Sequence, residues 1–236
     1  MFILSLDTST SLASAALARD ERIVAESLFS CDRTLSSRLM PEIERLLALE
    51  GLSAGDVDLF AAAVGPGSFT GVRCGVATVQ GLSLATGRPC IGFSTLAMLA
   101  ANLPLSPLPV CPLLDARKSE VYGALYDCSA SIPVPLISDC VLAPELLLDR
   151  INEAASGPVI FVGEGAVRYH EAITARMGER ALFAPFPHNG GRAANGALLA
   201  RHAFEQGRAL ADPSHLLPAY IRPSEAELAK RGNPPA

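Results

Sequence analysis

Two aspartates that end predicted strands are the first residues in this chain that could do chemistry. Asp7 follows the apolar run 2–6 and opens a turn of sequence D-T-S-T. A carboxylate in that place can bind a metal ion or orient phosphate groups, but it can equally accept hydrogen bonds from its own turn. Asp115 has the same setting after Leu114, in a turn with four charges over residues 115–120. That turn could lie in solvent or face a cleft.

A glycine-rich loop at 65–71, G-P-G-S-F-T-G, is the second candidate. Its backbone N–H groups and the helix that follows could bind phosphate, or the loop could be a tight turn that lets strand and helix pack closely. Neither nucleotide-binding fingerprint, G-x-x-x-x-G-K-[ST] or G-x-G-x-x-G, is present, so spacing alone favours the tight turn. Thr70 is expected to cap the helix. Arg73 and Gln80 on that helix could face a ligand, a partner protein or water.

The cysteines and histidines form no recognisable catalytic or metal-binding pattern. No C-x-x-C pair occurs among the six cysteines, and no two histidines are four residues apart. A zinc site of the H-E-x-x-H type is therefore excluded. No Ser/His/Asp or Cys/His set can be identified from spacing either. We expect no catalytic and no metal-binding residue.

The composition indicates a globular protein of the cytoplasm. The 236 residues are 50% hydrophobic, which is enough for the core of one large or two small domains. The net charge is −5 and no Lys- or Arg-rich run occurs, so independent binding of nucleic acid is not expected. The chain shows neither a secretion signal nor a run of about 18 apolar residues, so we expect no membrane span and reduced thiols.

The elements that must position these residues begin with a β-meander, with strands predicted at 2–6, 11–17 and 23–29. A helix is expected over 34–49, because apolar residues recur there at helical spacing: Leu35, Leu39, Ile43, Leu46 and Leu47. Such a stripe is typical of a helix that packs on its own core, and it equally fits a helix that packs on a partner.

The glycine loop connects a predicted strand at 60–64 to a predicted helix that stops at Gly87 and Pro89. The strand carries no charge, as expected where both faces of a sheet are covered. A short strand at 90–93 and a short helix at 96–101 follow.

A proline-rich segment at 103–109 separates the two halves and predicts domains over 1–103 and 104–236. The second half repeats the opening, because Asp7 and Asp115 are each followed by Ser, Ala and Leu at the same offsets. The repeat indicates either a chance similarity of two hairpins or a duplicated α/β unit with a cleft between its halves. Further strands are predicted at 121–127, 140–142 and 159–162, and helices at 144–152, 166–177 and 193–206. The last helix could pack back on the first half.

Five stretches carry a family signature when they are taken together. They are I-L-S-L-D-T-S at 3–9, G-P-G-S-F-T-G-V-R at 65–73, G-L at 81–82 with Gly87, L-D-A-R at 114–117, and P-A-Y-I-R at 218–222 continuing through A-E at 226–227. Over nearly its whole length the chain resembles the bacterial TsaB family, also called YeaZ, a small relative of the enzyme TsaD. The resemblance implies the actin/Hsp70-like ATPase (ASKHA) fold, an α/β architecture of two related lobes, each with a mixed β-sheet and helices.

The resemblance also implies a role in making threonylcarbamoyladenosine, the modified adenosine beside the anticodon of tRNAs that read codons starting with A. TsaD transfers the threonylcarbamoyl group to tRNA, and this chain would be an accessory subunit that binds and activates TsaD together with the ATPase TsaE. The chain alone is then expected to bind no cofactor, with ATP or ADP bound only in the complex. It is expected to meet tRNA only through the complex and to form a homodimer when alone.

The catalytic relatives carry an H-x-x-x-H pair after the strand that follows the glycine-loop helix. Here the matching stretch is T-L-A-M-L, from Thr95 to Leu99, which has no imidazole to bind a metal. This departure implies a non-catalytic subunit. One alternative is an independent ATPase or kinase of the same fold, in which Asp7, Asp115 and the glycine turns would bind phosphates and metal. The other alternative is a protease.

Complexes of this family join through two helices of the first lobe, which here match 34–49 and 71–86. On these helices the expected partner contacts are Leu39, Ile43, Leu46, Val72, Val76 and Val79. Close approach of a partner helix is expected at the small residues Gly75, Ala77, Gly81 and Ser83. A second copy could use the same surface, so homodimer and heterodimer would compete. The candidate nucleotide or cleft contacts are Asp7, Gly67, Arg73, Asp115 and Arg117.

Overall fold

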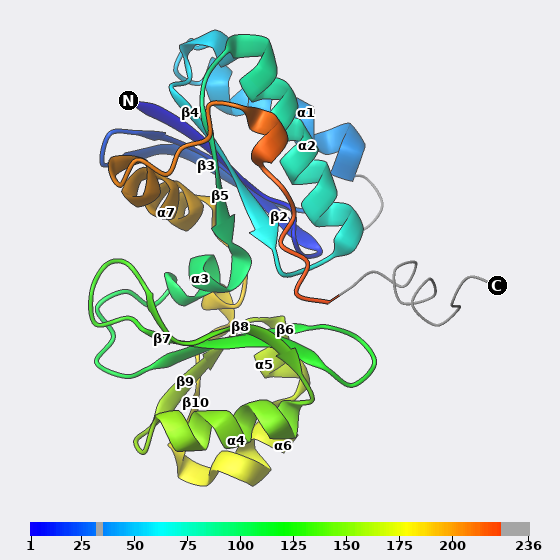
Figure 1. The fold of residues 1–236 in the computed structure, drawn as a ribbon, viewed down its shortest axis with the longest axis vertical. Helices are drawn as coiled ribbons and strands as arrows, with labels where there is room; N and C mark the ends of the chain where they lie inside the picture. The colour runs from blue at the N-terminus through cyan, green and yellow to red at the C-terminus, as the bar shows by residue number, and fades with distance from the viewer. Residues whose placement is uncertain (32–34, 223–236) are drawn as a thin grey trace, which may run out of the picture.

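The computed structural model describes residues 1–31 and 35–222. Within these residues the chain forms two five-stranded sheets, one in each half, and helices cover both. Figure 1 shows the two lobes one above the other, with the short helix α3 (Thr95–Ala100) between them. The expected α/β fold of two related lobes is therefore confirmed.

The first sheet has the strand order β3-β2-β1-β4-β5. Strands β1 (Phe2–Asp7), β2 (Leu12–Arg19) and β3 (Arg22–Ser30) pair antiparallel as the predicted meander. Strands β4 (Leu59–Gly65) and β5 (Cys90–Ser94) continue the sheet in parallel with β1. The side chains of β1 and β4 are almost all buried, because helices cover both faces of the sheet.

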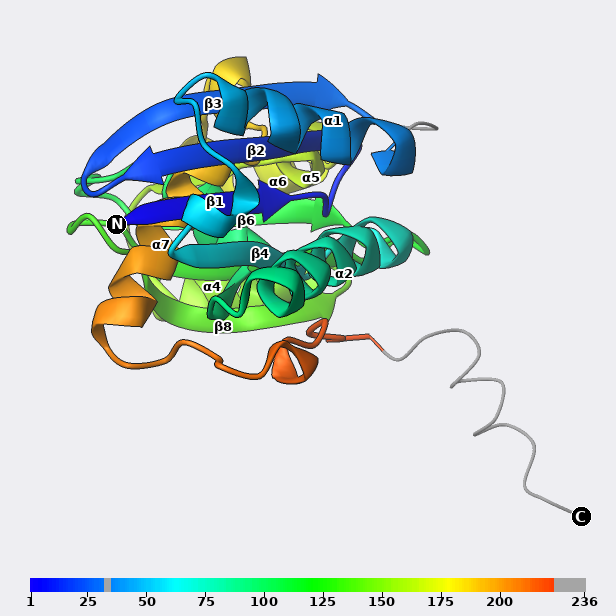
Figure 2. The same ribbon diagram turned by 90° about the horizontal axis from the view of Figure 1, so that it is seen from above.

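Helices α1 (Leu35–Ala48) and α2 (Phe69–Thr86) lie side by side on one face of the first sheet, and α7 (Ala193–Glu205) covers the other (Figures 1 and 2). The helix predicted over 34–49 thus forms, although its expected first residue lies outside the described ranges. Its apolar stripe faces the sheet, and so do the alanines of α7: Ala197, Ala200 and Ala203. The chain returns to the first lobe with α7, after it has built the second sheet.

The second sheet has the order β10-β9-β6-β7-β8, which matches the topology of the first. Strands β6 (Val110–Asp115), β7 (Val121–Asp127) and β8 (Val134–Leu142) form an antiparallel meander, while β9 (Val159–Val162) and β10 (Ala181–Phe183) run parallel to β6. The repeat in the sequence is therefore a duplicated sheet topology rather than a chance similarity of two hairpins.

Helices α4 (Pro144–Ala154), α5 (Glu164–Arg168) and α6 (His170–Met177) pack on one face of the second sheet, and α3 packs on the other. Four short 3-10 turns complete the described elements: η1 (Ala54–Asp56), η2 (Gly178–Arg180), η3 (Phe186–His188) and η4 (Pro213–His215).

Three predicted boundaries were wrong. Strand β8 begins at Val134 rather than at residue 140, because an edge strand with one exposed face has a weak apolar pattern. The helix predicted over 166–177 is two helices, broken at Tyr169, whose N–H caps α5 by donating to the carbonyl of Gly165. Helix α2 begins at Phe69, so its N-cap is Ser68 and not Thr70.

Candidate functional site

A cavity of about 820 Å³ lies between the two lobes. The first lobe lines it with the turn at 8–11 and with the glycine loop, and the second lobe lines it with the turn at 114–117 and with Glu164. The predicted cleft residues Gly67, Asp115 and Arg117 are brought together here, although they come from both halves of the sequence. Asp7 and Arg73 do not line this cavity.

Asp7 is fully buried beneath the cavity floor, contrary to its expected place as a cleft contact. Its Oδ1 accepts a hydrogen bond from the Ser9 N–H (2.9 Å), and its Oδ2 has no hydrogen-bond partner. Gly191 covers that oxygen so closely that a Cβ there would lie inside 3.0 Å of it. Burial raises the pKa of Asp7 above its ordinary value, although the hydrogen bonds with Ser9 oppose the shift. In this structure the carboxyl has no route to a ligand in the cleft.

The glycine loop is packed against the turn that follows Asp7. The Ser68 N–H donates to the Ser9 carbonyl (2.7 Å), and the Thr8 hydroxyl donates to the Gly71 carbonyl (2.7 Å). A Cβ on Gly67 would come within 3.0 Å of the Ser9 carbonyl oxygen, and a Cβ on Gly71 within 3.0 Å of the Thr8 carbonyl oxygen, so only glycine permits these contacts. The geometry favours the tight-turn interpretation, because the Ser68 N–H that a phosphate could use is already bonded.

Asp115 is the centre of a charge cluster at the other side of the cavity. Its carboxylate accepts from the Arg117 N–H (3.0 Å) and lies 3.2 Å from the Arg168 guanidinium and 3.5 Å from that of Arg117. Burial and the nearby Asp115 charge together raise the pKa of Glu164. The charge of Asp115 is thus balanced within the lobe, while the Arg117 side chain remains 82% exposed.

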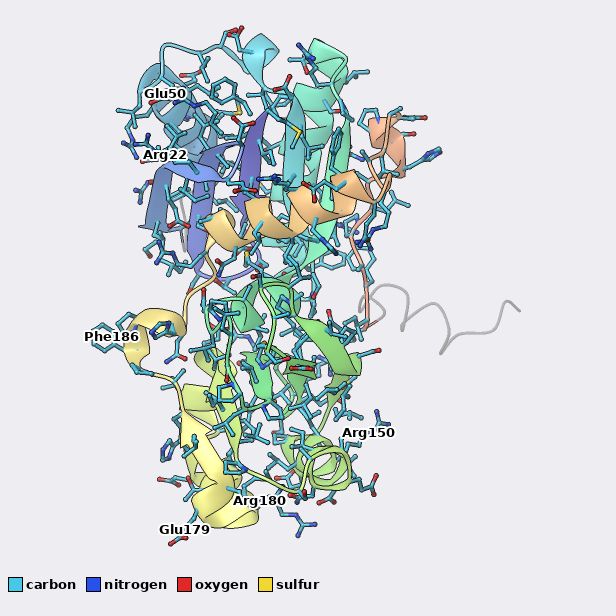
Figure 3. The ribbon with its side chains drawn as sticks, turned by 90° about the vertical axis from the view of Figure 1, so that its left-hand side faces the viewer. Arg22, Glu50, Arg150, Glu179, Arg180 and Phe186 are labelled. Carbon is cyan, nitrogen blue, oxygen red and sulfur yellow. The ribbon has the colours of Figure 1, made fainter. Side chains whose placement is uncertain are left out.

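A second hollow of about 520 Å³ adjoins this cluster on the second lobe, and Asp115, Arg117 and Glu164 line both. Phe186 of η3 stands at its rim with 88% of its surface exposed, and Figure 3 shows its ring pointing away from the molecule. Local sequence patterns did not indicate Phe186, because a lone phenylalanine between two prolines carries no periodicity.

The six residues predicted to contact a partner are all in the protein's own core. Leu39, Ile43, Leu46, Val72, Val76 and Val79 are at most 3% exposed and pack against the first sheet. Their side chains therefore cannot meet a partner, and this assignment was wrong. The apolar stripe of a helix marks its covered face, so the free faces of α1 and α2 are on their opposite sides.

The outer face of α1 and α2 carries a different set of residues. On α2, Ala77, Gly81 and Leu84 are exposed, and Leu84 is 75% exposed. A Cβ on Gly81 would meet no atom within 4 Å, so another chain can approach the helix backbone there. On α1, Met40 is an exposed large apolar residue. The small residues Gly75 and Ser83, in contrast, face inward.

Arg73 lies at the N-terminal end of this outer face and holds the end of the described chain. Its Nε donates to the Tyr220 hydroxyl (2.6 Å), and its guanidinium lies 3.7 Å from the centre of the Phe69 ring. Phe69 and Tyr220 stack with ring centres 5.0 Å apart. Gln80, two turns further along α2, donates to the carbonyls of Pro213 and Leu216. Arg73 and Gln80 therefore bind the chain's own C-terminal arm.

Helix α3 occupies the place where catalytic relatives are expected to carry their histidine pair. Thr95 and Leu99 are buried between the lobes, and the Thr95 hydroxyl has no hydrogen-bond partner. Ser94 caps the helix and also donates to Asp139 of the second lobe. Across residues 1–31 and 35–222, no three His, Cys, Asp or Glu side chains gather as a metal site. None of the helices in those ranges is long and apolar enough to cross a membrane.

Comparisons with known proteins give a consistent result. Residues 24–229 match the family model described as "TsaD: tRNA N6-adenosine threonylcarbamoyltransferase". The chain is 42% identical over 185 residues to the tRNA threonylcarbamoyladenosine biosynthesis protein TsaB of Haemophilus influenzae, covering 72% of this chain and 74% of that protein. It is 29% identical over 227 residues to the TsaB of Bacillus subtilis, covering 96% of each.

Solved structures agree with these sequence relatives. YeaZ from Pseudomonas aeruginosa superimposes with a TM-score of 0.79 at 32% identity, over 93% of this chain and 99% of that one. Component A of the (R)-2-hydroxyglutaryl-CoA dehydratase of Acidaminococcus fermentans superimposes with a TM-score of 0.50 at 11% identity, over 86% and 98% of the two chains. The second likeness shows a shared fold alone.

Proposed function

This chain belongs to the TsaB, or YeaZ, family, and we propose that it serves in the biosynthesis of threonylcarbamoyladenosine on tRNA as an accessory subunit without chemistry of its own. In this role it binds a TsaD-type transferase and supports its activity together with the ATPase TsaE. The tRNA meets the chain only within that assembly, and any ATP or ADP is bound by the complex rather than by this chain alone.

The observation that carries the proposal is the uncovered outer face of α1 and α2. Leu84 of α2 and Met40 of α1 are exposed apolar side chains on helices that lie side by side (Figure 1). Ala77 and Gly81 of α2 are exposed small residues, and the space beside Gly81 leaves room for a partner helix. Exposed apolar side chains that gather on one face mark protein interaction surfaces. Because the same face can bind a second copy, a homodimer competes with the complex.

Two further features support a subunit that does no chemistry. The stretch from Thr95 to Leu99 lacks imidazoles and lies in the core between the lobes. Asp7, the carboxyl best placed by the fold to serve a metal, is sealed under Gly191. Metal-dependent chemistry at either region would need that region to open, at the cost of exposing buried apolar surface.

The test is size-exclusion chromatography with light scattering of the chain, alone and mixed with the TsaD of its own organism. Leu84→Glu should abolish the heterocomplex, because it places a charge in the contact. Leu146→Glu is the matched control, since Leu146 is a 56% exposed leucine on α4 of the other lobe. A Leu84→Glu variant that still binds TsaD as tightly as the control would overturn the proposed surface. A wild-type chain that ignores TsaD would overturn the proposed function.

An independent nucleotide-dependent enzyme is the second candidate, and the interlobe cavity favours it. Its volume of about 820 Å³ suits a small ligand, and Arg117, whose side chain is 82% exposed although it pairs with Asp115, adds a positive charge to its lining. ATP turnover by the purified chain alone decides between the two functions. Sustained hydrolysis that is lost on Asp115→Ala would support the enzyme, and its absence in wild type would support the subunit.

A further inference from the structure

Residues 210–222, here called the strap, run along the first lobe after α7 (orange to red in Figure 1). Leu210 exchanges two backbone hydrogen bonds with Cys90 of β5, at 2.8 and 3.0 Å. Further along, the Ala219 N–H donates to the Val64 carbonyl of β4 (2.7 Å), and Leu216 is buried in the core beneath α2. The strap is thus an integral part of the first lobe.

The last described residue of the strap crosses to the second lobe. The Arg222 guanidinium donates to the Ala116 carbonyl (2.7 Å) and forms an ion pair with Glu120. Both contacts are in the β6–β7 turn, which lines the interlobe cavity. One side chain therefore connects an arm of the first lobe to a wall of the cleft that belongs to the second.

The turn that Arg222 holds has an unusual backbone. Arg117, Lys118 and Ser119 all have positive φ angles, of 63°, 52° and 59°. Residues other than glycine adopt this conformation reluctantly, and a run of three persists only where surrounding contacts hold it. The Ala116 N–H donates to the Glu120 carbonyl, and Arg222 binds the same two residues from outside. The shape of the turn is therefore coupled to the position of the strap.

The other end of the coupling is on α2. Tyr220 of the strap is held by Arg73, and Arg73, Ala77 and Gly81 follow one another at four-residue spacing on the outer face of the helix. A protein seated on that face also meets Arg73 and Tyr220. Any contact that fixes Tyr220 restricts Arg222, because only one residue separates them in the chain.

We propose that the strap transmits partner binding on α2 to the interlobe cleft, by holding Arg222 against the β6–β7 turn. This inference rests on the proposed function, because it takes the partner to be the TsaD-type chain. Contact on the outer face of α2 immobilises Tyr220. Arg222 is then held on Ala116 and Glu120. The strained β6–β7 turn therefore keeps the conformation in which it lines the cleft. Partner binding and the state of the cleft are linked in both directions.

Hydrogen–deuterium exchange, measured by mass spectrometry on the full chain, tests the strap directly. In the chain alone, Arg222→Gln should speed exchange at the Ala116 and Glu120 amides about fivefold, the loss expected for a partly exposed charge pair. Arg176→Gln is the matched control, because it removes an arginine–aspartate pair on the surface of the second lobe. Equal exchange of the turn in wild type and Arg222→Gln would overturn the proposal.

The same measurement with saturating TsaD tests the binding of TsaD on α2 and the transmission through the strap separately. Wild type should show slowed exchange on α2 and also at the turn, whereas Arg222→Gln should show it on α2 alone. Tyr220→Phe, which removes the hydroxyl that Arg73 binds, should lose at least half of the effect at the turn. Equal slowing of the turn in Arg222→Gln and wild type would overturn the strap. Absence of slowing on α2 in wild type would overturn the proposed function. The contact between the strap and the turn would still be tested by comparing wild type and Arg222→Gln without TsaD.

Discussion

Replacing Gly71 by alanine should destabilise the protein, whereas the same replacement at Gly81 of the same helix should stabilise it. At Gly71, the new Cβ would lie inside 3.0 Å of the Thr8 carbonyl oxygen. A backbone carbonyl cannot rotate away as a side chain can, so α2 would have to move off the sheet. At Gly81, nothing lies within 4 Å of the new methyl group.

The magnitudes follow from three effects. Overpacking at Gly71 costs about 1–3 kcal/mol. Loss of the hydrogen bond from the Thr8 hydroxyl to the Gly71 carbonyl costs about 1 kcal/mol more. The helix propensity of alanine returns about 1 kcal/mol at either position. We therefore expect Gly71→Ala to lose about 1–3 kcal/mol and Gly81→Ala to gain up to about 1 kcal/mol.

Urea denaturation followed by far-UV circular dichroism measures both free energies of unfolding. The two midpoints should move in opposite directions while the slope of the transition stays constant. If both variants shifted the midpoint in the same direction by the same amount, the close seating of α2 on the Asp7 turn would be refuted. A loss of TsaD binding by Gly81→Ala could then be assigned to the added methyl group on the proposed contact face, because a stabilised variant does not lose binding by unfolding.

Two further predictions concern Asp7 and Ser94. Burial raises the pKa of Asp7 above its ordinary 3.8, so the contribution of Asp7 to stability is fully present below pH 3.8 and is lost as the pH rises through the folded value. Asparagine does not titrate, so the free energy of unfolding of Asp7→Asn minus that of wild type should increase as the pH rises from 3.8. Urea denaturation from pH 3 to neutrality measures this difference, and a difference that stays constant would contradict the explanation. Ser94→Ala should lower the free energy of unfolding by about 1–2 kcal/mol, because it removes the cap of α3 and the bond to Asp139. The control is Ser106→Ala, which removes a serine hydroxyl bond within a turn. If Ser94→Ala and Ser106→Ala lowered the thermal midpoint equally, the bond between Ser94 and Asp139 would add no stability beyond that of an ordinary turn bond.

Local patterns predicted much of the fold. The meander, the strand–glycine loop–helix unit and the second strand–Asp turn are each specified by residues close together in the chain, so their periodicity is visible without a structure. The errors fell where local pattern is weak. Strand β8 is an edge strand, and Tyr169 interrupts a helix without a proline or glycine to mark the break.

Partner contacts show a different limit of the sequence. The stripe of Leu39, Ile43 and Leu46 fits a helix that packs on its own sheet as well as one that packs on another protein, because both contacts need the same apolar spacing. Only the sheet beneath α1 decides between them, and it covers all three side chains. The exposed residues of the outer face, such as Gly81 and Leu84, have no periodicity that distinguishes them from solvent-facing positions.

The sequence by itself determined the repeated strand–Asp–strand pattern, the glycines that α2 needs at its start, and the absence of a histidine pair at Thr95 and Leu99. Each of these depends on residue type at fixed local spacing. Only the tertiary structure decided that Asp7 is sealed beneath Gly191, that Arg73 binds Tyr220 and that Arg222 binds the turn of the other lobe. These contacts join residues more than a hundred positions apart, so they arise only when the last part of the chain folds back on the first lobe and meets the turn of the second.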